Sequence, residues 1–161
     1  MRVTLLRMSQ LKRDDAYWMR LALKEARKAE KKGEVPVGAV AVLNREKIAS
    51  AHNLSIQSSD PTAHAELVAL RRAGLRLRNY RLSDIIMYVT KEPCAMCAGA
   101  LVWARVRKVV FGCRDPQAGA CGSLFDFSKV KNFNHSFEAH GGVLEQECRH
   151  LLVKFFRKKR A

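Results

Sequence analysis

Stretches with the two-residue period of β-strands alternate along this chain with stretches that have the period of an α-helix. Such alternation predicts an α/β fold, because the helices that connect the strands pack on the faces of the sheet. We expect a three-layer αβα sandwich with a mixed central sheet of about five strands and helices on both faces. Helices are predicted at 14–33, 60–74, 94–105 and from about 142, and strands at 35–43, 47–53, 85–89 and 108–111.

Capping residues and helix breakers set the ends of several of these elements. Asp14 or Asp15 can cap the first helix, and Asp60 followed by Pro61 has the pattern of a helix start. A proline and Gly38 near the start of the first strand indicate an irregular stretch where another part of the protein approaches closely. We find no repeat or linker, so residues 1–13 are interpreted as a basic arm and residues 14–161 as a single domain.

The charge balance is unusual, because the chain has 30 Lys and Arg residues but 15 Asp and Glu residues, which gives a net charge of +15. A surplus of this size attracts polyanions and favours a nucleic-acid partner, although a basic surface without any partner is the alternative. No apolar run approaches the roughly 18 residues that cross a bilayer, and the first residues lack the pattern of a secretory signal. The sequence therefore predicts a cytoplasmic protein with no membrane partner.

Two short motifs contain the candidate metal ligands. The first is His64-Ala65-Glu66, and the second is Pro93-Cys94-Ala95-Met96-Cys97. Either motif alone is weak, since a lone His is usually an ordinary polar residue and a C-x-x-C can be a redox pair, half a zinc site or two buried thiols. Together they are informative: Cys94 and Cys97 lie on one face of the first turn of a helix, whose positive end stabilises thiolates. With the imidazole of His64, this donor set suits Zn²⁺.

A site with three protein ligands has one position left for water, which is typical of catalytic rather than structural zinc. We find no fourth ligand near either motif, and Cys113, Cys121 and Cys148 are interpreted as core thiols. Glu66 follows the His by two residues and is not needed as a ligand, so it can exchange a proton with that water. The alternative for Glu66 is a helix-start carboxylate that the helix dipole favours.

The pair H-x-E and P-C-x-x-C is the signature of zinc deaminases. The chain further resembles the family of bacterial tRNA-specific adenosine deaminases, over about residues 17–160. The similar segments are Glu34-Val35-Pro36-Val37-Gly38-Ala39-Val40, Asp60-Pro61-Thr62-Ala63-His64-Ala65-Glu66, Asn79-Tyr80-Arg81-Leu82, Glu92-Pro93-Cys94-Ala95-Met96-Cys97-Ala98-Gly99-Ala100, Val109-Val110-Phe111-Gly112, Gly122-Ser123-Leu124 and Phe155-Phe156-Arg157.

The resemblance implies a cytidine deaminase-like fold and one zinc ion per subunit of a homodimer. It also implies hydrolytic deamination of adenosine to inosine in tRNA, at the wobble position of the anticodon stem-loop of an arginine tRNA. The implied site residues fall into three groups: the metal ligands His64, Cys94 and Cys97, the proton carrier Glu66, and the substrate-binding residues Asn53, Asp115, Phe156 and Arg157.

Two other functions compete with this interpretation. A deaminase of free nucleosides or bases, such as cytidine or guanine, would carry the same motifs, but would not need the positive charge or the basic end of the chain. A nucleic-acid-binding domain with structural zinc would need a fourth protein ligand. One departure from the family pattern is Lys91, which precedes Glu92-Pro93-Cys94 where many relatives have an apolar residue. We expect Lys91 not to touch the site.

Overall fold

The computed structural model describes residues 13–161, so nearly all of the predicted basic arm 1–13 lies outside the described residues. Helix α2 begins as expected after Asp14, whose Oδ1 accepts a hydrogen bond of 2.8 Å from the backbone N–H of Tyr17. The elements follow in the order α2 (Asp15–Lys31), β1 (Gly38–Leu43), β2 (Glu46–His52), α3 (Ala65–Leu77), β3 (Ile86–Lys91), α4 (Ala95–Trp103), β4 (Lys108–Cys113), the short 3₁₀ helix η1 (Phe127–Lys129), β5 (Glu138–His140) and α5 (Glu145–Arg160).

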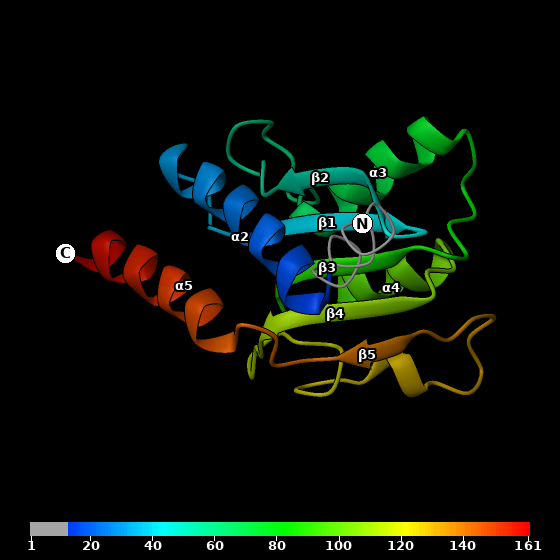
Figure 1. The fold of residues 1–161 in the computed structure, drawn as a ribbon. Helices are drawn as coiled ribbons and strands as arrows, with labels where there is room; N and C mark the ends of the chain where they lie inside the picture. The colour runs from blue at the N-terminus through cyan, green and yellow to red at the C-terminus, as the bar shows by residue number, and fades with distance from the viewer. Residues whose placement is uncertain (1–12) are drawn as a thin grey trace, which may run out of the picture.

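The five strands form one mixed sheet in the order β2-β1-β3-β4-β5. Strand β1 is antiparallel to both of its neighbours, with Val40 opposite Ser50 on β2 and Tyr88 on β3. Strands β3, β4 and β5 are parallel to one another. Helices α2 and α5 pack on one face of the sheet, and α3 and α4 cover the other (Figure 1). The predicted three-layer sandwich with a mixed sheet of five strands is therefore confirmed.

Three elements differ from the prediction. Strand β1 begins at Gly38 rather than at residue 35, because the backbone N–H of Val37 bonds to the oxygen of Val35 in a local turn. A Cβ on Gly38 would lie only 2.0 Å from the backbone oxygen of Ala22 on α2. This contact is the close approach expected near Gly38. Helix α3 begins at Ala65, since Asp60 does not cap it but accepts hydrogen bonds from the N–H and hydroxyl of Thr62 in a separate turn. The third difference is β5, which the sequence pattern did not locate.

The topology brings four strand ends to one edge of the sheet. Strands β2, β3, β4 and β5 run in the same direction, so their carboxyl ends lie at the same edge, on the left in Figure 1. Helices α3 and α4 come after β2 and β3 and begin near this edge, and the carboxyl end of α5 lies on the same side (Figure 1). None of the helices in residues 13–161 has the length and apolar character needed to span a bilayer.

Candidate active site

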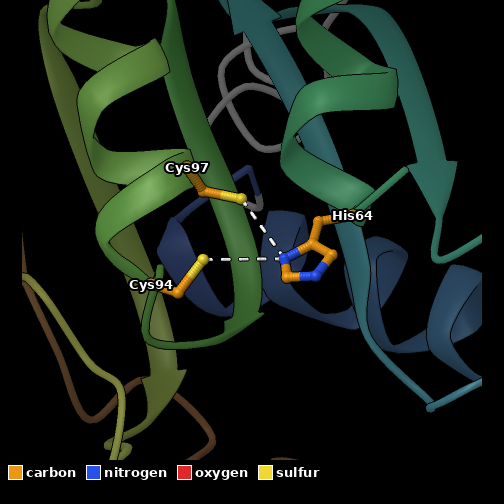
Figure 2. Close-up of side chains that lie close together, drawn as sticks. All are labelled: His64, Cys94 and Cys97. Carbon is orange, nitrogen blue, oxygen red and sulfur yellow. Dashed lines mark hydrogen bonds between the residues drawn. The ribbon is translucent and has the colours of Figure 1, made fainter. Parts of the chain in front are cut away.

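Three potential metal ligands converge at the starts of α3 and α4. His64 is the residue before α3, Cys94 is the residue before α4, and Cys97 lies in the first turn of α4. The His64 Nδ1 lies 3.6 Å from the Sγ of Cys94 and 3.5 Å from the Sγ of Cys97 (Figure 2). All three donor atoms lie within 4.8 Å of one another, and no other His, Cys, Asp or Glu in the described part of the chain joins this group.

These separations fit a zinc ion. Tetrahedral zinc with bonds of about 2.0–2.3 Å holds its ligand atoms about 3.5 Å apart. One imidazole and two thiols that can ionise are also the donor types that zinc prefers. A hydrogen bond from the Cys97 thiol lowers the pKa of Cys94 to about 4. Burial acts in the opposite direction, and His64 lowers the pKa further. The same hydrogen bond, together with burial, raises the pKa of Cys97. A thiolate is therefore available at the helix start, where a cation would bind.

Glu66 lies beside this group without belonging to it. Its side chain is 4% exposed, in the first turn of α3, and it borders the same cavity as His64 and Cys94. Burial raises the pKa of the Glu66 carboxyl above its usual range. A carboxyl with a raised pKa next to a metal group is suited to taking up and releasing a proton.

A cavity of about 240 Å³ opens on this group at the carboxyl edge of the sheet. The sequence-predicted residues Asn53, Asp115 and Phe156 all line it, although they come from three distant parts of the chain. Arg157 is not among the lining residues. The remaining walls come from the segment after α2, the end of β3 and the loop after β4, so that the full lining is Val35, Val37, Asn53, His64, Glu66, Lys91, Glu92, Cys94, Asp115, Ala118 and Phe156.

The side chain of Asn53 is held in one orientation. Its Oδ1 accepts a hydrogen bond of 2.8 Å from the backbone N–H of Ala65, which is one of the free donors at the start of α3. The residue is buried, and its amide nitrogen is left to donate to a molecule in the cavity. The same bond ties the end of β2 to the helix that follows His64.

Glu92 organises the loop after β4, and sequence reasoning did not identify it. Its carboxylate, in a residue that is 2% exposed, accepts hydrogen bonds from the backbone N–H of Asp115 (2.9 Å), Cys121 (3.0 Å) and Ser123 (3.0 Å), and from the Ser123 hydroxyl. A Cβ on Gly119 would lie 2.5 Å from the Glu92 Oε2, so the loop packs closely around this carboxylate. A glutamate is usually exposed, and nothing in the sequence pattern around Glu92 indicates this role.

Replacing Glu92 by Gln should lower the free energy of unfolding by about 2–3 kcal/mol, because the amide NH₂ would face a backbone N–H that now donates to an oxygen. Urea unfolding at a fixed, saturating zinc concentration measures the change. Glu46→Gln is the matched control, since Glu46 is exposed at the start of β2. Equal stability of the Glu92 and Glu46 variants would contradict the role of Glu92.

Lys91 touches the site, contrary to the expectation from the sequence. Its Nζ lies 2.8 Å from the Oδ2 of Asp115, and both residues line the cavity. The reason is the parallel pairing of β3 with β4, which places Lys91 opposite Cys113 and brings the following loop next to it. Burial raises the pKa of Asp115, but Lys91 and the backbone N–H groups of Gln117 and Ala118 lower it more, so the net shift is downward.

The comparisons with known proteins agree with this geometry. Residues 12–113 match the model of the cytidine and deoxycytidylate deaminase zinc-binding region. A tRNA-specific adenosine deaminase of Bacillus subtilis is 50% identical over 146 residues, which cover 91% of each chain. The chain belongs to the cytidine and deoxycytidylate deaminase family, and within it to the tRNA-specific adenosine deaminases. This membership excludes the alternative of a binding domain with structural zinc, and the deaminase is a zinc enzyme with a His-Cys-Cys group that could hold one ion.

Two solved structures are similar to this deaminase over most of its length. A structure from studies of A-to-I editing by tRNA:A34 deaminases at the wobble position of transfer RNA has a TM-score of 0.82 and 40% identity, and the match covers 84% of this chain and 99% of that one. A guanine deaminase from Nitrosomonas europaea has a TM-score of 0.72 and 26% identity, with 87% and 83% covered. The fold is therefore shared with deaminases of both nucleic acid and free bases.

Proposed function

We propose that this deaminase converts adenosine to inosine in tRNA, at the wobble position of the anticodon. The proposal rests on one cavity, in which the metal group and Glu66 meet Asn53, Asp115 and Phe156. The net charge of +15 suits a polyanionic substrate and is not needed for a neutral nucleoside. The identity with tRNA-specific adenosine deaminases supports the same substrate class.

The residues of the cavity account for the chemistry. His64, Cys94 and Cys97 would hold the zinc ion, which when bound would supply a nucleophile by lowering the pKa of a water molecule to near neutrality. Glu66 takes one proton of that water and delivers it to N1 of the adenine, while the remaining hydroxyl adds to C6. Glu66 then moves the proton of this hydroxyl to the amino group at C6. The C–N bond breaks, ammonia leaves, and C6 keeps the oxygen as the carbonyl of inosine. Asn53, fixed by its bond to Ala65, presents its amide nitrogen to the nucleoside.

A stacked adenine cannot reach a cavity of this kind, so the base has to be splayed out of the loop. Phe156 offers an aromatic face for a splayed nucleotide, because its side chain is 40% exposed and borders the cavity, whereas the preceding Phe155 is buried. We propose that Arg157 and the basic residues after it contact the RNA backbone next to Phe156. Asp115 is proposed to accept a hydrogen bond from a ribose 2′-OH, which would favour RNA over DNA.

We further propose that the substrate is the anticodon stem-loop of an arginine tRNA and that the enzyme is a cytoplasmic homodimer. All five cysteines are free thiols, which suits a reducing compartment. Leu75, Tyr80 and Trp103 expose at least three quarters of their side chains on α3, α4 and the segment between them, as is typical of a subunit interface. Sedimentation analysis tests the dimer, and a monomer at micromolar concentration would contradict it.

The substrate is tested by incubating purified enzyme with tRNA and sequencing the product, in which inosine is read as guanosine. We expect conversion at the wobble adenosine of an arginine tRNA and little ammonia release from free adenosine, cytidine or guanine. The difference arises because a free base lacks the backbone that the basic surface binds.

A deaminase of free bases is the competing function, and the similarity to a guanine deaminase is the observation that favours it. Ammonia release from guanine or cytidine at a rate well above the rate on tRNA would establish that alternative. Absence of inosine in every tRNA of the mixture would contradict the proposed function directly.

A further inference from the structure

Lys91 places a positive charge inside the cavity that the reaction described above does not use. It is the last residue of β3, its side chain is 33% exposed, and it lines the cavity together with Glu66 and Asp115. An ammonium group has three N–H donors, and the ion pair with Asp115 uses one of them. No second protein acceptor for Lys91 is found within residues 13–161, so two donors remain for a bound molecule.

Asp115 is held almost completely by protein groups. Its Oδ1 accepts from the backbone N–H of Gln117 (3.1 Å) and of Ala118 (3.3 Å), and its Oδ2 accepts from Lys91 (2.8 Å). A carboxylate has about four acceptor positions, so roughly one remains for a donor on the substrate. The side chain is 12% exposed, which leaves that position open to the cavity.

An unpaired carboxylate at this place would repel the strand that carries the target base. Each nucleotide brings one negative phosphate, and repulsion between like charges is strong in a partly buried site. Lys91 offsets the charge of Asp115 and still has donors to offer. The geometry suits a lysine that bridges a protein carboxylate and a phosphate oxygen, because its three donors point in different directions.

We propose that Lys91 is a substrate-binding residue that contacts a phosphate oxygen of the RNA strand beside the splayed adenosine while it holds Asp115 in place. The partner is an anionic backbone oxygen, since lysine is a donor only and has no acceptor for a base edge. This inference rests on the proposed tRNA substrate and adds a specific contact to it.

The test compares Lys91→Met with the parent in binding of an anticodon stem-loop RNA, measured over a range of potassium chloride concentrations. Both chains carry Glu66→Ala, so that the RNA is not turned over. Lys91→Met should weaken binding roughly tenfold, as expected for one lost charge-assisted hydrogen bond. It should also reduce the slope of log affinity against log salt by about 0.7–1, the value for one phosphate contact. Lys91→Arg should restore the slope, because the charge is kept.

Two controls separate this contact from general charge and from a structural role. Lys47→Met removes the same charge at the far end of β2, about 20 Å along the strand from Asn53, and should leave the slope unchanged. Asp115→Asn removes the partner of Lys91, and Lys91→Met should lower the slope equally in that background. If Lys91 acts only by holding Asp115, its substitution will change nothing once Asp115 is replaced, and the proposal is wrong.

Failure of this inference is distinct from failure of the proposed function. If the enzyme with Glu66 intact forms inosine in tRNA but the salt slope does not respond to Lys91→Met, only the phosphate contact is contradicted. If the enzyme with Glu66 intact forms no inosine in tRNA, the proposed substrate is contradicted, whatever the slope.

Discussion

Glu66→Ala is expected to keep one zinc ion per chain and to lose deamination by a factor of about 10²–10⁴. The carboxylate is buried beside the metal group and belongs to no ligand cluster, so its removal leaves the three donor atoms in place. The reaction needs a proton moved from water to N1 of the adenine and another moved to the leaving amine. Among the described residues that line the cavity, Glu66 is the carboxylate in the first turn of α3, next to His64. Asp115 and Glu92 are both engaged by protein donors.

The measurement combines metal analysis with turnover on tRNA. Glu66→Gln is the matched variant, since it keeps the shape of the side chain but cannot carry a proton, and it should be as inactive as Glu66→Ala. Full zinc content with lost activity in both variants supports the role of proton carrier. Substantial turnover by either variant would rule that role out, and loss of zinc would contradict the expectation that the site holds its metal without Glu66.

Cys97→Ser should empty the metal site and abolish turnover. Cys97 is fully buried, and the substitution puts a hydroxyl in place of a thiol whose Sγ lies 3.5 Å from the Nδ1 of His64. Zinc binding in a site of this donor type requires deprotonated sulfur. The folded state also loses the stabilisation that bound metal provides, which is about 4 kcal/mol when free zinc exceeds its dissociation constant a thousandfold.

Zinc content, turnover and thermal unfolding with and without added zinc measure these effects. Cys148→Ser is the control, because Cys148 is equally buried but lies on α5 outside the metal group. The control should retain its metal and show the zinc-dependent rise in melting temperature. A Cys97→Ser protein that retains stoichiometric zinc would show that Cys97 is not a ligand.

The order of strands and helices along the chain, apart from β5, could be predicted from the sequence because each of these elements has a local pattern. The metal group could be predicted because the C-x-x-C spacing places Cys94 and Cys97 on one turn of a helix, and the H-x-E motif offers His64 as a third donor. Helix α3 was placed too early because Asp60 and Pro61 have the composition of a helix start, and the bond from Thr62 that makes them a turn is not visible in the pattern.

What escaped prediction depends on contacts between distant segments. Strand β5 consists of Glu138, Ala139 and His140, a polar stretch that becomes a strand only because it pairs with the edge of β4. Glu92 and Lys91 have roles because the loop after β4 folds over them, and a single sequence does not show which loop will do so. The three other cysteines, by contrast, are buried as expected.

The residues that form this cavity come from two kinds of structural element. The potential metal ligands and Glu66 lie at the starts of two helices that pack on the sheet, whereas Asp115 and Phe156 come from a loop and from a terminal helix. Asp115 and Phe156 are thus encoded far along the chain from His64, Glu66, Cys94 and Cys97. Mutations in the loop and the tail can alter which molecule is accepted while the metal group stays intact.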